Sequence, residues 1–242
     1  MLFRSARRLW IAPLSFKSRV IEMLDREIAK GEKGRVAIKV NALNNVDLME
    51  KLIECSQAGV KVELFIRGIC SLRPGVPGLT ENIRVSSVVG RWLEHSRIYS
   101  FGEGEEQRLF IGSGDLLNRN LERRVEAFVE AVTPDTREQL NAVLDALRAD
   151  KEKSRRMLPD GTYIRDKGGE GTSSQEALYR YFSTHKVSNV EEAPAPEAEP
   201  AIVPEAEAEA PAPEAAPAPE VKAPEKEPEA RGLRAWLRSL FS

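Results

Sequence analysis

Five arginines and a histidine lie close together in residues Phe65–Phe101, which read FIRGICSLRPGVPGLTENIRVSSVVGRWLEHSRIYSF. The arginines are Arg67, Arg73, Arg84, Arg91 and Arg97, and His95 is one of two histidines among 242 residues. A guanidinium can donate two parallel hydrogen bonds to phosphate, and an imidazole can accept or deliver a proton or a phosphoryl group. Arg67 follows an apolar run and precedes Gly68, so it should stand at a strand end. The pattern predicts a phosphate-binding site at a strand edge.

Periodic apolar residues predict the elements that would hold this site. They indicate strands over residues 9–13, 35–43, 60–66, 83–89, 97–101, 108–111 and 125–132. They indicate helices over residues 16–28, capped by Ser15, over 47–58, ended by Gly59, and over 134–150. A strand, a helix and a second strand in succession are typical of parallel pairing. The expected fold class is α/β, a single domain with a mixed sheet and flanking helices.

The remaining segments carry weaker signals. Residues 72–82 should be a loop, Asp160-Gly161 a turn and residues 175–182 a short helix, and His185 should be an ordinary exposed histidine. The expected organisation is an N-terminal extension over residues 1–8, the folded domain over 9–150, an extension over 151–190, a disordered Ala/Pro/Glu-rich linker over 191–230 and an amphipathic helix over 231–242.

Charge is distributed unevenly along the chain. The net charge is −2, but residues 191–230 contain twelve Glu against two Lys, which leaves the rest of the chain basic. A basic domain suits an anionic partner, although many basic surfaces bind nothing in particular. The linker cannot bury enough apolar surface to offset its ordering entropy. The last residues, GLRAWLRSLFS, place apolar side chains opposite Arg234 and Arg238, a pattern typical of docking on an anionic membrane surface or in a partner's groove.

Cysteine content and hydropathy indicate a cytoplasmic protein. Cys55 and Cys70 are too few for a disulfide framework, and Cys55 falls on a predicted helix as a small core residue. No run approaches the roughly 18 apolar residues of a membrane-spanning helix. The start, MLFRSARRLW, lacks the apolar core and cleavage site of a signal peptide. The terminal helix is the candidate for peripheral contact with the inner membrane.

Two short motifs surround His95. HSR is followed, one strand later, by IGSGDLLNRN, and together they resemble the His-x-Lys and Gly-Ser-x-Asn elements of phospholipase-D-like proteins. In those proteins a histidine at a strand end is the nucleophile, and nearby basic and small polar groups hold the phosphoryl group. Arg97 replaces the lysine here, which favours a two-pronged grip over a point charge.

Longer stretches extend the resemblance. Cys55–Phe101, GSGDLLNRNLERRVE at 112–126 and LPDGTYIR at 158–165 closely resemble the C-terminal part of bacterial polyphosphate kinase, and the likeness runs from about Leu9 to Arg165. The family makes inorganic polyphosphate from ATP, reversibly, through a phosphorylated histidine. Its catalytic half consists of two phospholipase-D-like domains that face each other across a polyphosphate tunnel.

The resemblance implies roles for four residues. Arg67 matches an ATP-phosphate ligand of the family, and His95 matches the second active-site histidine, which assists transfer and contacts the nucleotide. Arg97 and Arg119 stand at motif positions that would hold phosphates. ATP and polyphosphate are the implied ligands, and the complete site would need Mg²⁺.

Departures from the family pattern leave two functions open. The family's phosphorylated histidine, its magnesium-binding arginines and a nucleotide-contacting tyrosine belong to a preceding domain, which we expect this chain to lack. Leu117-Asn118-Arg119-Asn120 stands where the family usually shows Met-Pro-Arg-Asn.

The chain could be one half of a polyphosphate kinase site, completed by a protein partner or by another copy. It could instead be a non-catalytic remnant that binds polyphosphate or nucleotide, docked through its terminal helix. A lipid-cleaving phosphodiesterase is a more distant reading, no nucleic-acid partner is expected, and enzymatic activity of the chain alone is left open.

Overall fold

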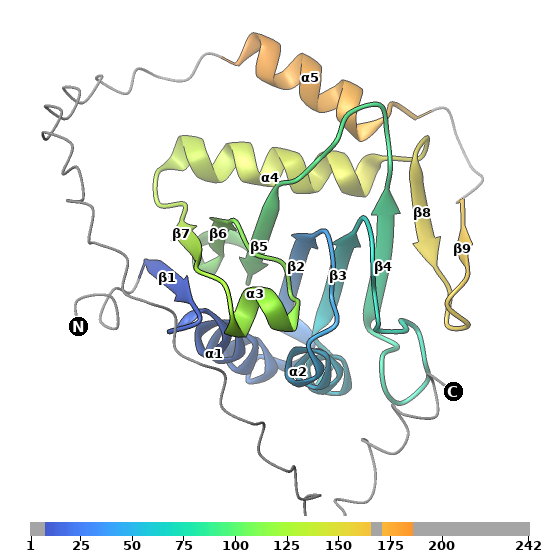
Figure 1. Ribbon diagram of the computed structural model, residues 1–242. Helices are drawn as coiled ribbons and strands as arrows, with labels where there is room; N and C mark the ends of the chain where they lie inside the picture. The colour runs from blue at the N-terminus through green and yellow to red at the C-terminus, as the bar shows by residue number, and fades with distance from the viewer. Residues whose placement is uncertain (1–7, 166–170, 186–242) are drawn as a thin grey trace, which may run out of the picture. The chain divides into compact units, whose positions relative to one another are not determined.

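The computed structural model describes residues 8–165 and 171–185. These residues form one mixed sheet of nine strands with helices on both faces (Figure 1). The strand order is β1-β7-β6-β5-β2-β3-β4-β8-β9. The strands are β1 (Leu9–Ala12), β2 (Arg35–Val40), β3 (Lys61–Ile66), β4 (Ile83–Val88), β5 (Arg97–Phe101), β6 (Arg108–Gly112), β7 (Glu126–Glu130), β8 (Ser154–Met157) and β9 (Tyr163–Ile164). The helices are α1 (Phe16–Ile28), α2 (Val46–Gln57), α3 (Asn118–Glu122), α4 (Pro134–Ala149) and α5 (Ser174–Thr184), with short 3₁₀ turns η2 (Gly31–Lys33) and η3 (Gly104–Glu106).

The three central strands β2, β3 and β4 are parallel, and the other neighbours pair antiparallel. The crossover from β2 to β3 runs through α2, as the strand–helix–strand pattern predicts. Asn45 caps α2 by accepting a hydrogen bond from the Leu48 amide at 3.1 Å. Gly59 follows the helix with a φ of +88°, the left-handed conformation that glycine adopts without strain.

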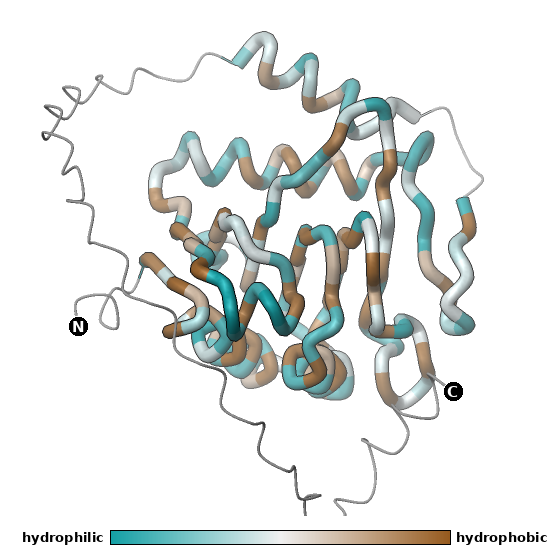
Figure 2. Tube along the Cα trace, viewed as in Figure 1, coloured by the Kyte–Doolittle hydropathy of each residue, from teal (hydrophilic) through white to brown (hydrophobic). Residues whose placement is uncertain are grey.

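Two apolar layers lie on opposite faces of the sheet. Val36, Ile38 and Val40 point toward α1 and α2, whereas Ala37 and Ile98 belong to the layer covered by α4. Figure 2 shows apolar residues along the central strands and alternating apolar and polar residues along α4. Each fully buried aliphatic or aromatic side chain contributes about 1.5–3 kcal/mol.

The predicted elements agree with the structure to within a few residues, and the predicted α/β class with a mixed sheet is confirmed. The prediction that Ser15 caps α1 is wrong. Its hydroxyl instead accepts a hydrogen bond from the Ile11 amide at 3.1 Å, and it makes no side-chain hydrogen bond to the start of the helix. The short helix α3 and the strands β8 and β9 carry no sequence signal, because α3 is one turn long and β8 reads SRRM, with only Met157 buried. The turn between these two strands lies at Asp160-Gly161, as predicted.

Strand register brings several polar segments to one edge of the sheet. Lys39, near the end of β2, pairs with Phe65 on β3 and Ile98 on β5. Arg97, at the start of β5, pairs with Gly112 at the end of β6. We call this end of the strands, where β2, β3 and β6 end and β5 begins, the site edge. It includes the carboxyl ends of the parallel strands, outside which ligands bind in open α/β sheets.

The predicted linker over 191–230 and the terminal helix over 231–242 lie outside the described residues. Within the described part of the chain, no helix is long and apolar enough to cross a membrane.

Candidate functional site

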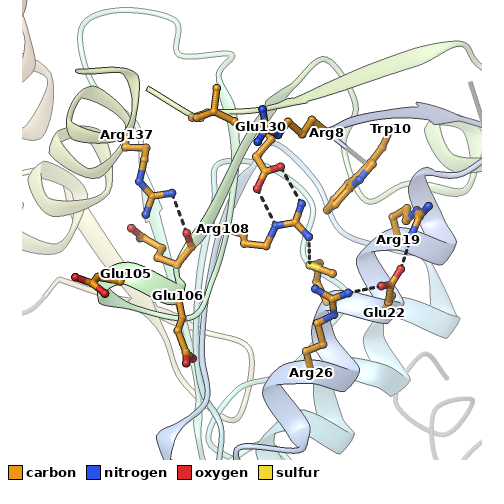
Figure 3. A pocket seen from close by; sticks show the side chains of 14 residues that line it. Arg8, Trp10, Arg19, Glu22, Arg26, Glu105, Glu106, Arg108, Glu130 and Arg137 are labelled. Atoms are coloured by element: carbon orange, nitrogen blue, oxygen red, sulfur yellow. Dashed lines mark hydrogen bonds and ion pairs between the residues drawn. The ribbon is translucent and has the colours of Figure 1, made fainter. Parts of the chain in front are cut away.

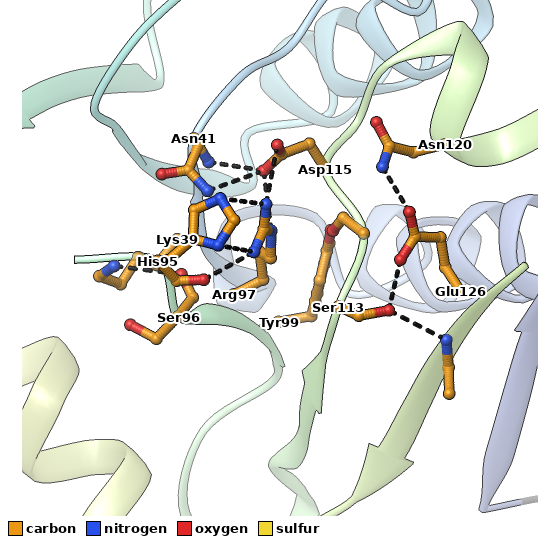
Figure 4. A network of polar contacts seen from close by, with 12 residues as sticks. Lys39, Asn41, His95, Ser96, Arg97, Tyr99, Ser113, Asp115, Asn120 and Glu126 are labelled. Atoms are coloured by element: carbon orange, nitrogen blue, oxygen red, sulfur yellow. Dashed lines mark hydrogen bonds and ion pairs between the residues drawn. The ribbon is translucent and has the colours of Figure 1, made fainter. Parts of the chain in front are cut away.

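His95 lies at the site edge, in an exposed loop over residues 89–96 that leads into β5. Its only side-chain contacts within the described residues are with Arg97 (Figure 4). Nδ1 lies 3.0 Å from Nη1 of Arg97, and Nε2 lies 2.9 Å from Nη2. A neutral imidazole has one unprotonated ring nitrogen, so only one of these contacts can be a hydrogen bond. The guanidinium therefore fixes the position of the ring by close packing as well as by hydrogen bonding.

Arg97 is buried and all five of its N–H groups face partners. Nε donates to Oδ1 of Asp115 at 3.1 Å and Nη2 donates to Oδ2 at 3.1 Å, a two-pronged ion pair. Nη1 donates to the backbone carbonyl of His95 at 2.7 Å. The remaining two N–H groups face the His95 ring. Arg97 thus links the buried carboxylate to the exposed histidine.

Asp115 stands where the Gly-Ser-x-Asn pattern has its asparagine, and it is buried. Besides Arg97, its Oδ1 accepts the backbone N–H of Asn41 at 2.7 Å. Asn41 directly follows β2, so this carboxylate ties together the ends of three strands. A buried charge pair with these extra hydrogen bonds has its polar groups satisfied, as a low-dielectric site requires.

Lys39 is a buried cation of the site that sequence reasoning missed. Its Nζ donates to the carbonyl of Ser96 at 3.1 Å and lies 3.8 Å from Oε2 of Glu94. Burial lowers the pKa of Lys39; Glu94 offsets this in part, and the charges of Arg67 and Arg97 lower the pKa further. The signal was present in the sequence, because Lys39 interrupts an otherwise apolar strand, RVAIKV.

Arg67 follows β3 at the site edge and is half-buried. No side chain of the described residues hydrogen-bonds or ion-pairs with its guanidinium, while its carbonyl accepts the Ser87 hydroxyl at 3.3 Å. Arg119 is exposed on α3. The first residue of this helix, Asn118, accepts a hydrogen bond from Nδ2 of Asn45 at 2.7 Å. The structure therefore brings Arg67, His95 and Arg97 to one edge, and shows no contact between Arg119 and these three.

A second polar network lies beside the first at the same edge (Figure 4). The hydroxyl of Ser113 donates to the buried carboxylate of Glu126, and Nδ2 of Asn120 donates to the other carboxylate oxygen at 2.6 Å. Tyr99, a fully buried core residue, donates its hydroxyl hydrogen to the Gly114 carbonyl at 2.8 Å. These contacts hold the GSGD loop, and with it Asp115, against the sheet.

The described residues do not fit a magnesium site. Mg²⁺ prefers carboxylate and other oxygen ligands, and no group of three or more His, Cys, Asp or Glu side chains in the described ranges could hold a metal ion. At the site edge Asp115 already pairs with Arg97, and Glu126 accepts from Ser113 and Asn120.

A cavity of about 890 Å³ lies at the opposite end of the strands, where β6 begins and β7 ends (Figure 3). Arginines line it, but glutamates neutralise several of them. Arg108 forms a two-pronged pair with Glu130 at 2.7 and 2.8 Å, and Glu22 is shared by two further arginines. This cavity is a surface ion-pair cluster remote from His95.

Among the residues that the structure describes, His185 and Cys55 have no contact with the residues of the site edge, whereas Cys70 follows Arg67 by three residues and pairs with Leu43 after β2. His185 was predicted to be an ordinary exposed histidine, but the structure gives it two partners. Its ring stacks on Tyr181 and its Nε2 lies 3.0 Å from Oδ1 of Asp135. Cys55 is a buried core residue, as predicted. Burial raises the pKa of Cys55 to about 12 and that of Cys70 to about 11, so neither is an activated thiol.

Comparisons with known proteins agree on one family. A family model described as "Polyphosphate kinase C-terminal domain 2" matches residues 9–177. The polyphosphate kinase of Synechocystis sp. (strain PCC 6803) is 43% identical over 178 residues, which cover 72% of this chain and 24% of that protein. The polyphosphate kinase of Streptomyces coelicolor is 45% identical over 162 residues, which cover 66% of this chain and 22% of that protein.

Among solved structures, a polyphosphate kinase from Porphyromonas gingivalis matches with a TM-score of 0.69 and 32% identity, over 73% of this chain and 28% of that chain. The chain spans about a quarter of the length of these relatives. The matched range, residues 9–177, includes the whole site edge together with the hairpin β8–β9.

Proposed function

We infer that this chain, which belongs to the polyphosphate kinase family, supplies one half of a polyphosphate kinase active site. The reaction is the reversible transfer of the terminal phosphate of ATP to inorganic polyphosphate. The other half, with the histidine that carries the phosphoryl group, would come from a protein partner or from another copy of a longer chain.

The observation that carries this proposal is that the Arg67 guanidinium, which has no side-chain partner among the described residues, lies at the same end of the strands as the exposed His95 that Arg97 holds in place. Phosphoryl transfer requires cationic donors held where negative charge is spread over the transferred group, and little covalent chemistry from the protein. Among the described residues, no side chain occupies the donors of Arg67, so they can bind phosphate oxygens. Lys39, near the end of β2, adds a buried cation whose pKa is lowered by burial and further by the charges of Arg67 and Arg97.

The residues then divide into two roles. Arg67 binds the phosphates of ATP or of the polyphosphate end, and His95 contacts the reacting phosphoryl group from this half of the site. Arg97 is a positioning residue, because its five N–H groups already face Asp115 and His95. Arg119, which is exposed on α3, would bind a phosphate group farther along the polyphosphate.

Each transfer balances as two steps. The bond between the β,γ-bridging oxygen and the γ-phosphorus of ATP breaks, ADP leaves, and the unprotonated ring nitrogen of a neutral partner histidine takes the phosphoryl group while the other ring nitrogen keeps its proton. The terminal polyphosphate oxygen then takes the phosphoryl group and the histidine is regenerated. Magnesium would bind to the half of the site that the partner supplies. A cytoplasmic site of action, with peripheral membrane contact through residues 231–242, is part of the same proposal.

The test is ATP-dependent polyphosphate synthesis by this chain alone, by a polypeptide carrying the phosphohistidine domain, and by the two mixed. We expect activity only in the mixture, and a loss of about 100- to 1,000-fold for Arg67→Met or His95→Ala there. Arg148→Met, which breaks an exposed ion pair with Glu63 at 2.7 Å, is the matched control.

Activity of the chain alone would refute the need for a partner. Binding of ATP or polyphosphate with no synthesis in any mixture would favour the non-catalytic binding function instead. The absence of both binding and synthesis would refute the proposal.

A further inference from the structure

We propose that helix α5 clamps the loop over residues 89–96, and that Gln175 on α5 is a positioning residue for His95. The structural part of this proposal stands on contacts alone. Its catalytic consequence rests on the proposed function, because it matters only if His95 meets the reacting phosphate.

Gln175 forms hydrogen bonds to the loop backbone through both the oxygen and the nitrogen of its side-chain amide. Its Oε1 accepts the Trp92 N–H at 2.9 Å, and its Nε2 donates to the Trp92 carbonyl at 2.7 Å. The side chain is buried, with 5% of its surface exposed, so water does not compete for these groups. The amide thus satisfies both the backbone N–H and the carbonyl of Trp92, as a neighbouring strand would. A carboxylate or a shorter amide could not make both bonds.

The loop is shaped to admit this side chain. A Cβ built on Gly90 would overlap the amide oxygen of Gln175, so only glycine lets the loop approach so closely. One turn along α5, Tyr179 stacks on the Trp92 ring with centroids 5.6 Å apart and planes 22° apart. Leu93, next in the loop, is 78% exposed and gains little from packing.

The helix is anchored independently of the loop at both ends. At its start, the backbone N–H and hydroxyl of Ser174 donate to Oδ2 of buried Asp150 at 2.8 and 2.7 Å. Just beyond its end, His185 lies 3.0 Å from Asp135, the second residue of α4. Figure 1 shows α5 beside α4, on the same side of the sheet as the loop. The clamp therefore has a fixed base.

Within the described residues, the ties of the loop to the sheet gather at its second half. Gln175 holds the loop at Trp92, whereas Lys39 donates to the Ser96 carbonyl at 3.1 Å and lies 3.8 Å from Glu94, and Arg97 donates to the His95 carbonyl. His95 lies between Trp92 and Ser96, and its own side-chain contacts within the described residues are with Arg97 alone. Releasing Trp92 would leave the segment that carries His95 held only at Glu94, at the His95 carbonyl and at Ser96, and the ring would sample positions away from the Arg97 guanidinium.

The chain's two histidines make the test direct. In histidine-labelled protein, NMR reports one ring at the site edge and one at the far end of α5. The variants are Gln175→Ala and Gly90→Ala, the second of which would push the Gln175 amide aside without deleting it. Gln107→Ala is the matched control, because its amide also bridges the sheet and α4, to Ser100 at 3.0 Å and Asn141 at 2.9 Å, but at the opposite edge.

We expect both clamp variants to shift the His95 ring signals and to remove the nuclear Overhauser contacts between His95 and Arg97, while the His185 signals stay in place. Amide exchange of Trp92 should accelerate, and affinity for ATP or tripolyphosphate should fall about tenfold. The Gln107→Ala control should change none of these.

Two results would overturn the proposal. Unchanged His95 signals, with faster exchange at Trp92, would show that the clamp does not reach the histidine. Changes at both histidines would show that Gln175 only docks α5. The ring signals need no ligand, so they decide the clamp even if the wild-type chain binds no ATP, a result that would count against the proposed function alone.

Discussion

The ion pair between Arg97 and Asp115 should be worth more than any other charge pair of the site. Arg97→Met would leave the Asp115 carboxylate buried with only the Asn41 hydrogen bonds. Asp115→Asn would leave the Arg97 guanidinium buried without its counter-charge, while the new amide oxygen could still accept the Asn41 N–H. The double variant would remove both charges and keep that backbone hydrogen bond. These three variants and the wild type form a double-mutant cycle.

The magnitudes follow from burial, since both side chains are less than 10% exposed. Breaking a buried pair by removing one partner costs about 3–5 kcal/mol. For a domain of this size, 3 kcal/mol corresponds to a fall in Tm of about 6–12 °C. Replacing both charges is often neutral, so the double variant should lie within about 1 kcal/mol of wild type. Arg148→Met, at the exposed pair with Glu63, should cost at most about 1 kcal/mol.

Urea denaturation at pH 7 measures the free energy of unfolding for each variant, and tripolyphosphate titration measures binding. We expect the double variant to recover stability but not affinity, because His95 has lost the guanidinium that positions it. Single variants that cost less than 1 kcal/mol, like the exposed pair, would refute the reasoning. So would costs that simply add, because additivity would mean that the two charges do not interact.

Three further predictions concern other buried groups. Burial lowers the pKa of Lys39, and Glu94 offsets this only in part, so the charged amine opposes folding. Wild type should therefore gain stability relative to Lys39→Met as pH rises through the lowered pKa toward 10.5, and a constant difference in urea denaturation would contradict this. For Asp150, burial opposes ionisation, but hydrogen bonds from the start of α5 and from the segment after α4 outweigh it and lower the pKa. Asp150→Asn should lower the free energy of unfolding by about 1.5–3 kcal/mol at pH 7. This difference from wild type should shrink as pH falls through 3.8, and a difference that does not depend on pH would contradict the assignment. Burial raises the thiol pKa of Cys55 to about 12 and that of Cys70 to about 11. In the native protein at pH 8, both should react with an aromatic disulfide far more slowly than in the urea-unfolded protein, and half-buried Cys70 should react first. Equal rates in the native and unfolded protein would disprove the assignment.

Local sequence patterns were enough to predict most of the sheet and the chemistry of its edge. Alternation in RVAIKV and helical spacing over residues 16–28 report which side of an element is buried, and this depends on near neighbours only. Arg67 and His95 could be selected because their side chains have distinctive chemistry and stand in long family-like motifs. The strands β8 and β9 escaped prediction because β8 is mostly polar and β9 has only two residues, so neither shows an apolar periodicity.

Only the tertiary structure showed which donors of each site residue already have partners. The sequence offers the fork of Arg97 to phosphate, but two of its N–H groups face Asp115, 18 positions away. Gln175 carried no signal at all, because the backbone that it holds lies 83 positions earlier in the chain. The sequence by itself determined which side chains could bind phosphate. Whether their donors are already satisfied depends on contacts between distant segments, which exist only once the strands have paired and the helices have packed.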